Sequence, residues 1–167
     1  MDLDAVPTAV ASVPQGVSPR SVLTGALAAV ALTGAFLRPW ERRVYVPYRD
    51  PVGILTVCEG VTHGVLHQRY TDAQCDEVVR QQVRQHLAEM AVCIHVPLTQ
   101  HQWVAIGSWA YNTGTARACR SQLVRKINAG ASRNDWCREL LKWDYAGGRR
   151  LRGLTRRREA EYAECLR

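Results

Sequence analysis

The sequence predicts an α+β fold that is mostly helical and has one small β-hairpin lobe. Residues 45–62 are rich in β-branched and aromatic side chains and are interrupted by Pro51 and Gly53, as in two short strands joined by a turn. After this segment, apolar residues recur at intervals of three and four, the spacing of one helix face. A chain of 167 residues with 47% hydrophobic content can bury one core. We therefore expect one domain with a short appendage.

The first 37 residues precede this main domain and divide into two parts. Residues 1–20 are rich in Pro, Ala, Val and Ser and lack a regular hydrophobic period, so we expect a disordered leader. Residues 21–37 carry no charge, and more than half of them are Ala, Gly or Thr. This length is close to the lower limit for a membrane span, and side chains this small predict a weak hold on lipid. The main domain then comprises residues 38–167.

Helices are expected through most of the remaining chain. The capping sequences Thr71-x-x-Gln74 and Thr99-x-x-Gln102 mark two helix starts. The first helix continues to Met90 on one apolar face, and the second ends at residues 112–114. Three further helices are predicted at 121–128, 135–143 and 155–166. Four tryptophans at helical spacing are expected in the core rather than on a sugar-binding surface: Trp103, Trp109, Trp136 and Trp143.

Two carboxylates and a hydroxyl follow the spacing Glu41-x8-Asp50-x5-Thr56. A helix end that runs into a hairpin can bring two carboxyl groups to opposite walls of one cleft. Hydrolysis of a glycosidic bond uses such a pair. One carboxyl gives its proton to the leaving oxygen, and the other activates water or stabilises an oxocarbenium ion. The spacing alone favours a simpler alternative, in which Glu41 is a surface acid paired with Arg42 or Arg43 and Asp50 is a turn residue.

Four further sequence blocks come after the Glu41–Asp50–Thr56 segment, in the second half of the chain. They are Tyr-Asn-Thr-Gly at 111–114, residues 121–130, Trp-Asp-Tyr-Ala-Gly-Gly at 143–148, and Gly-Leu-Thr-Arg-Arg-Arg-Glu-Ala-Glu at 153–161. Together with the Glu41–Asp50–Thr56 spacing, they resemble the phage-type lysozymes of glycoside hydrolase family 24. The resemblance covers residues 40–167. It implies a lysozyme-like fold with a cleft between two lobes, and a muramidase that cuts the β-1,4 bond between N-acetylmuramic acid and N-acetylglucosamine for host cell lysis.

The resemblance also implies catalytic roles. Glu41 would be the general acid, with its proton retained by a partly desolvated site. Asp50, together with Thr56, would orient the attacking water. The family inverts configuration, which implies carboxyl groups about 6.5–9.5 Å apart with a water molecule between them.

Further residues gain expected roles in the same way. Tyr111 and Asn112 stand at a helix end where the family places substrate contacts. Arg157 resembles the family arginine that steadies the catalytic glutamate, although a solvated basic face is nearly as strong an expectation for any arginine of 156–158. One position departs from the family pattern. Where relatives often carry a histidine shortly after the hairpin threonine, this chain has Val61, which cannot form an ion pair.

Residues 21–37 resemble the signal-arrest-release segment of endolysins from lambdoid-like tailed phages, a weak span that is exported uncleaved and later leaves the membrane. We favour this interpretation over a cleaved secretory signal or a buried helix of a cytoplasmic protein. It implies a location at the periplasmic face of the host inner membrane, followed by release into the periplasm. The flanking charges oppose easy insertion, because Arg20 alone precedes the segment whereas Arg38, Arg42 and Arg43 follow it.

The net charge of +7 predicts attraction to an anionic polymer. Peptidoglycan with its acidic peptides fits this charge as well as DNA does, but the chain has no nucleic-acid-binding motif, so we expect no nucleic-acid partner. A wall-binding module without catalysis is a third possibility, and the presence of all three catalytic residue types disfavours it. We expect a monomer that needs no cofactor.

Six cysteines are spread over residues 58–165, which suits disulfides in an oxidising compartment. There is no Cys-x2-Cys pair, and the histidines do not cluster with the cysteines, so no metal site is expected. His63 and His67 are four apart, yet surface positions are the stronger expectation. Six cysteines allow 15 pairings. Chain order and resemblance to related endolysins favour Cys58–Cys75, Cys93–Cys119 and Cys137–Cys165.

Overall fold

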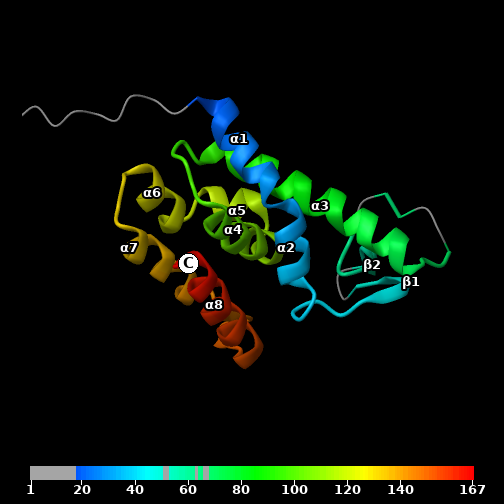
Figure 1. The fold of residues 1–167 in the computed structure, drawn as a ribbon. Coiled ribbons are helices and arrows are strands. Elements are labelled where there is room, and N and C mark those ends of the chain that lie inside the picture. The colour runs from blue at the N-terminus through cyan, green and yellow to red at the C-terminus, as the bar shows by residue number, and fades with distance from the viewer. Residues whose placement is uncertain (1–17, 51–52, 63, 66–67) are drawn as a thin grey trace, which may run out of the picture.

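The computed structural model describes residues 18–50, 53–62, 64–65 and 68–167 (Figure 1). Its helices form one body, and a two-stranded sheet extends from one side of it. The leader up to residue 17 and the histidines His63 and His67 lie outside the described residues. The predicted combination of a helical lobe with a small β-hairpin lobe is confirmed.

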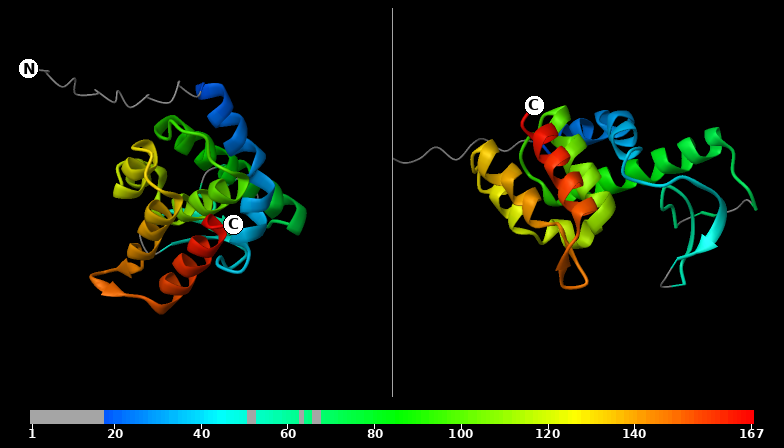
Figure 2. Two further views of the ribbon diagram at one scale, coloured as in Figure 1. Left: turned by 60° about the vertical axis from the view of Figure 1, so that its left-hand side comes forward. Right: turned by 90° about the horizontal axis from the view of Figure 1, so that it is seen from below.

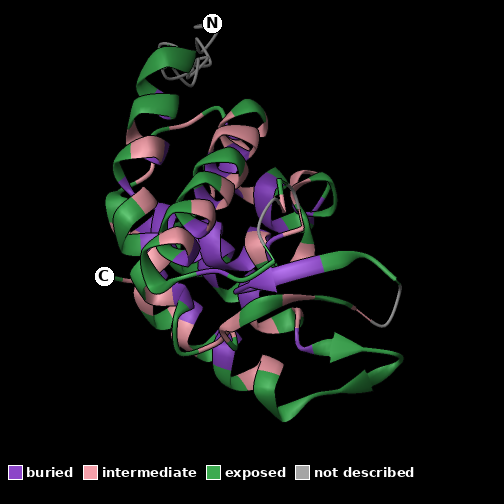
Figure 3. Cartoon of the chain, turned by 90° about the vertical axis from the view of Figure 1, so that its right-hand side faces the viewer, coloured by how far each residue is buried: buried purple, intermediate pink, exposed green. Residues whose placement is uncertain are grey.

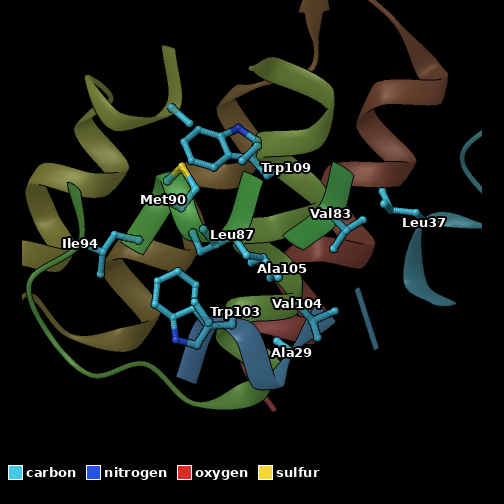
Figure 4. Packing of buried hydrophobic residues seen from close by; sticks show 14 of the residues in the cluster. Ala29, Leu37, Val83, Leu87, Met90, Ile94, Trp103, Val104, Ala105 and Trp109 are labelled. Atoms are coloured by element: carbon cyan, nitrogen blue, oxygen red, sulfur yellow. The ribbon is translucent and has the colours of Figure 1, made fainter. Parts of the chain in front are cut away.

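The central helix is α4 (Gln100–Thr113), in which every residue from 102 to 110 is buried. It packs against α2 (Val30–Leu37), α3 (Asp72–Cys93) and α8 (Arg152–Cys165). Trp103 and Trp109 are completely buried and lie on either side of Leu87 in Figure 4. A Cβ atom on Gly107 would come within 2.9 Å of side-chain atoms of Thr33 and Leu87. Glycine at this position therefore allows α2 and α3 to approach α4 closely.

The weakly apolar N-terminal segment forms α1 (Pro19–Ala28) and α2, which meet at Ala29 with a bend of 43°. The buried residues recur every three or four positions along both helices and form one stripe against α3 and α4: Val22, Ala26, Ala29, Thr33 and Leu37. Full burial of Leu37 contributes about 2 kcal/mol and fixes the end of α2. Among the described residues, no single helix has the length and hydropathy of a membrane span, but α1 and α2 meet that criterion together.

The hairpin consists of β1 (Val44–Arg49) and β2 (Leu55–Cys58), paired antiparallel with Tyr48 opposite Thr56. A bridge between Val57 and Val61 continues the lobe. Val61, where the family often has histidine, is buried in the core. The side chain thus provides apolar contact in place of a charge. β2 is buried along most of its length, as Figure 3 shows.

Both predicted capping boxes are present, at Thr71/Gln74 and Thr99/Gln102. α5 (Thr115–Cys119) and α6 (Gln122–Asn128) then lead to α7 (Arg133–Cys137). The helix predicted at 135–143 is instead α7 followed by a 3-10 helix, η1 (Arg138–Lys142).

A second hairpin, β3 (Tyr145–Ala146) with β4 (Arg149–Arg150), precedes α8, which packs on α4 and η1 (Figure 2). This hairpin was not predicted. Its turn is Gly147-Gly148, and both glycines have positive φ, 58° and 76°, as a two-residue hairpin turn requires.

Three disulfides link neighbouring elements. Cys58–Cys75 joins β2 to α3, Cys93–Cys119 joins α3 to α5, and Cys137–Cys165 joins α7 to α8. These are the pairs that the resemblance implied. Their Cα–Cα distances of 5.3, 5.6 and 6.0 Å lie within the ordinary range.

Candidate active site

Glu41 lies four residues beyond the end of α2, and its backbone N–H donates to the carbonyl of Leu37 at 3.2 Å. Its side chain is 23% exposed, so the carboxyl is partly buried. Nη1 of Arg157 donates to Oε1 of Glu41 at 2.5 Å. Within the described part of the chain, Arg157 is the residue that forms an ion pair with Glu41, and the sequence alternatives Arg42 and Arg43 do not.

Arg157 reaches Glu41 from α8, 116 positions along the chain. Its guanidinium is held on the other sides by α4 and α8, because Nη2 donates to the Ser108 carbonyl at 3.0 Å and Nε to Glu161 Oε1 at 3.2 Å. Only 5% of the Arg157 side chain is exposed. The guanidinium is therefore fixed in position, and it holds one oxygen of Glu41.

A cavity of about 520 Å³ opens beside this pair. Three parts of the chain line it: residues 39–41, Asn112 at the end of α4, and residues of the first turns of α8 together with Leu151 just before it. Its walls combine a carboxylate, an amide, two guanidiniums and the indole of Trp40. A larger cavity of about 650 Å³ lies between α1 and α3, but its lining is mainly apolar and contains no carboxylate. The chemistry favours the smaller cavity as the candidate active site.

Asp50 and Thr56 come together at the tip of the hairpin through Ile54. Oδ1 of Asp50 accepts the Ile54 N–H at 2.8 Å, and the Asp50 N–H donates to the Ile54 carbonyl at 2.9 Å. The hydroxyl of Thr56, which is almost fully buried, donates to the same carbonyl at 3.1 Å. Neither residue is among the described residues that line the Glu41 cavity. The structure thus groups Glu41, Asn112 and Arg157, and separately Asp50 and Thr56.

Tyr111 connects the two lobes. Its hydroxyl donates to the backbone carbonyl of Glu59 at 2.9 Å, and its ring lies 5.3 Å from the ring of His86. Burial raises the pKa of Tyr111, as do the nearby charges of Glu41 and Glu59, so the phenol keeps its proton. Tyr111 therefore uses its hydroxyl inside the protein, whereas Asn112 is exposed at the cavity.

A family model described as phage lysozyme matches residues 38–161. The chain belongs to the phage lysozyme family. It is 36% identical over 126 residues to the SAR-endolysin of Escherichia phage Mu, which covers 74% of this chain and 72% of that protein. It is 35% identical over 144 residues to the SAR-endolysin of Enterobacteria phage P21, covering 84% and 87%. The solved muramidase domain of SpmX from Asticaccaulis excentricus aligns with a TM-score of 0.72 at 25% identity, covering 84% and 95%.

These similarities confirm the predicted lysozyme-like fold and the prediction of an enzyme. The chain is a lysozyme-type glycoside hydrolase, and its curated relatives identify it as a phage endolysin for cell lysis.

This phage lysozyme has a second ion cluster beside Glu41 that sequence reasoning missed. Arg43 donates to Glu59 at 2.7 Å, to Asp72 at 2.7 Å and to Asp76 at 2.5 Å. Burial alone would lower the pKa of Arg43, but its hydrogen bonds to Asp76, Asp72 and Glu59 raise it above the usual value. The cluster ties the segment after Glu41 to the residue that follows β2 and to α3. Local sequence offered no signal for it, because its partners lie 16 to 33 positions away.

One group of side chains has the spacing of a metal site. Ligand atoms of Cys58, Glu59 and Cys75 lie within 4.8 Å of one another. The two sulfurs are joined in a disulfide, so neither is a thiolate that could bind a metal. Oε1 of Glu59 is also taken by Arg43. These residues therefore do not fit a metal ion.

Proposed function

We propose that the enzyme cuts the β-1,4 bond between N-acetylmuramic acid and N-acetylglucosamine in peptidoglycan, with inversion of configuration. The observation that carries this proposal is the Glu41 carboxyl, which faces a cavity from a part-buried position while Arg157 holds one of its oxygens. The other oxygen is then oriented to deliver a proton to the leaving glycosidic oxygen. The similarity to the muramidase domain of SpmX supports the choice of bond.

Asp50 and Thr56 would supply the other half of the reaction from the hairpin. The Ile54 N–H orients the Asp50 carboxylate, and Thr56 is held to the same turn. A sugar chain bound between the lobes would bring the anomeric carbon between Glu41 and Asp50. Water activated by Asp50 would then attack the face opposite to the leaving group, as an inverting mechanism requires. Asn112 would donate to the sugar at the cavity wall. The protein would act as a monomer without a cofactor.

Product analysis tests the bond and the stereochemistry together. Purified peptidoglycan is digested and the new reducing ends are reduced with borohydride. The proposal expects reduced muramic acid, whereas reduced glucosamine would contradict it. NMR of a short soluble substrate during the first minutes should show the α-anomer at the new end. A β-anomer formed first would show that the enzyme retains configuration and would contradict the inverting mechanism.

We further propose that residues 21–37 anchor the enzyme in the host inner membrane until release. The related SAR-endolysins support this location. In the structure, α1 and α2 pack on α3 and α4, and under this proposal that packing belongs to the released enzyme. While the segment is in lipid, α2 cannot position Glu41 beside Arg157. The anchored form would therefore be inactive.

The structure selects substitutions that test the anchor without disturbing the released fold. Ala28, Ala31 and Ala35 are exposed, so three leucines there strengthen the hold on lipid and leave the core intact. Gly25 is unsuitable, because a Cβ there would lie 3.3 Å from the Trp103 indole nitrogen. After collapse of the membrane potential, the leucine variant should stay in the membrane fraction and lyse cells later than wild type. A matched triple serine variant should be released at least as fast as wild type. Equal release of all three proteins, or a mature N-terminus after residue 37, would rule out the anchor.

A further inference from the structure

Behind Arg157 lies a second carboxylate that the reaction does not use. Glu161 is fully buried, as is Arg158, and both come from α8. Oε1 of Glu161 accepts from Ser108 Oγ at 2.7 Å, from Arg157 Nε at 3.2 Å and from Arg158 Nη2 at 3.1 Å. Its Oε2 lies 2.9 Å from Arg158 Nε. One buried carboxylate thus faces two buried guanidiniums.

Only one of these guanidiniums touches the catalytic carboxyl. Arg157 contacts Glu41 at 2.5 Å, whereas Arg158 turns to Glu161 and to Asn112 Oδ1 at 3.2 Å. Glu161, Arg157 and Arg158 together carry a charge of +1 beneath Glu41. Without the carboxylate they would carry +2, and without Arg158 they would carry zero.

These charges matter because burial leaves them poorly screened. A general acid needs its proton, and a bare guanidinium at 2.5 Å favours the ionised carboxylate. Burial raises the pKa of Glu161 above its usual value, and the charges of Arg158 and Arg157 offset that rise only in part. The two guanidiniums that lie within 3.2 Å of its oxygens favour the ionised carboxylate. Burial lowers the pKa of Arg158 to about 10, so it remains charged at neutral pH.

The other polar groups around this cluster come from α4, from the residue before β3 and from α8 itself. On α4 they are Ser108, Asn112, the part-buried phenol of Tyr111, and His101, which pairs with Glu164 of α8; Asp144 is the residue before β3. Asp144 is already paired with Arg150 at 2.5 Å. Glu161 is thus the carboxylate that directly offsets the charge of Arg157 on the side away from Glu41.

We propose that Glu161 is a positioning residue of the active site, which holds the Arg157 guanidinium against Glu41 and offsets its charge so that Glu41 can carry a proton. This inference rests on the proposed role of Glu41 as general acid. Arg158 acts in the opposite direction, because it adds positive charge that Glu161 must offset. The pair sets the pH range in which the enzyme works.

The test is the pH dependence of kcat/KM for three variants on a soluble peptidoglycan fragment. Glu161→Gln should shift the alkaline limb to lower pH by roughly one unit. Arg158→Gln should shift it to higher pH, and the double variant, which restores the charge of +1, should return it towards wild type. Glu159→Gln removes an exposed charge from the same helix and should leave the limb in place. Circular dichroism confirms that each variant is folded.

A purely structural role would lower kcat/KM without opposite shifts of the limb. If both single variants move the limb in the same direction, or if neither moves it, the inference is overturned. If Glu161→Gln does not fold, Arg158→Gln tests the inference by itself: an alkaline limb at higher pH supports it, and an unchanged or lowered limb overturns it.

Carboxyl-labelled glutamate NMR follows the titration of Glu41 directly, with Glu41→Gln assigning its signal. A Glu41 pKa that responds to the variants while Glu41→Gln stays active would uphold the coupling and refute the proposed function. If the Glu41 pKa is the same in all variants while Glu41→Gln is inactive, the proposed function stands and the coupling to Glu161 is refuted.

Discussion

Two ion clusters flank the segment that carries Glu41, and they differ in burial. On one side, Arg157 and Glu161 are buried between α4 and α8. On the other, the part-buried Arg43 meets the buried Glu59 and also Asp72 and Asp76, whose side chains are 73% and 48% exposed. Charges of the first kind act on one another with little screening, whereas the exposed charges of the second kind are weakened by water and salt. The buried cluster can therefore affect the protonation of Glu41, whereas the Arg43 cluster mainly fixes the position of the segment that follows Glu41.

The largest effect is expected from the buried side. Arg157→Met removes the partner of Glu41 and leaves Glu161 with one guanidinium fewer. Breaking a buried ion pair in this way should cost about 3–5 kcal/mol of unfolding free energy, with a loss of activity. Urea denaturation of wild type and variant measures the difference. A loss below about 1 kcal/mol would place this cluster in the same energetic class as an exposed pair.

A similar loss is expected at the hairpin from a covalent cause. Replacing both Cys58 and Cys75 with serine opens a link between residues 17 positions apart and should cost about 3 kcal/mol. The disulfide joins β2 to α3 covalently, so its contribution to the stability of the hairpin is separate from that of the Arg43 cluster. Mass mapping of the non-reduced wild type should show all three disulfides. Six free thiols in the active enzyme would contradict the oxidised state.

The Arg43 cluster should have the smallest effect. Arg43→Gln unpairs one buried carboxylate, Glu59, and two exposed ones. It should lower the melting temperature by less than Arg157→Met, and added salt should reduce the part of the loss that comes from Asp72 and Asp76. Hydrogen bonds to Arg43 lower the pKa of Asp72 and of Asp76. Their stabilisation is therefore complete above the ordinary aspartate pKa of about 3.9 and is lost as the pH falls below it.

Melting curves of wild type and Arg43→Gln at pH 7 and pH 2.5 check this dependence. The control is Arg80→Gln, which removes an exposed pair with Glu77 on α3. A difference between wild type and Arg43→Gln that persists in full at pH 2.5 would show that Arg43 acts by other means.

Sequence patterns predicted the features that depend on residues close by in the chain, such as helix starts and buried helix positions. Capping boxes at Thr71 and Thr99 mark helix starts, because their hydrogen bonds close within three residues. The core positions of Trp103, Trp109 and Trp136 followed from helical spacing. Trp143 is only partly buried, and it meets the edge of Trp109 at 5.0 Å between centroids.

Features set by distant contacts were not predictable. Nothing in the run Arg156-Arg157-Arg158 shows that the first is exposed and the other two are buried, because α4 decides this from outside the run. The Glu41 spacing identified the candidate acid, but its partner Arg157 could be proposed only through the family resemblance.

The central claim is that Glu41 is the general acid of a peptidoglycan hydrolase. The direct measurement compares lysis of outer-membrane-permeabilised Gram-negative cells by wild type, Glu41→Gln and Glu159→Gln, the last an exposed acid on the same enzyme. Glu41→Gln should fold normally and lose at least ~10²-fold in activity, while Glu159→Gln should match wild type. Near-normal lysis by a folded Glu41→Gln variant would contradict the account.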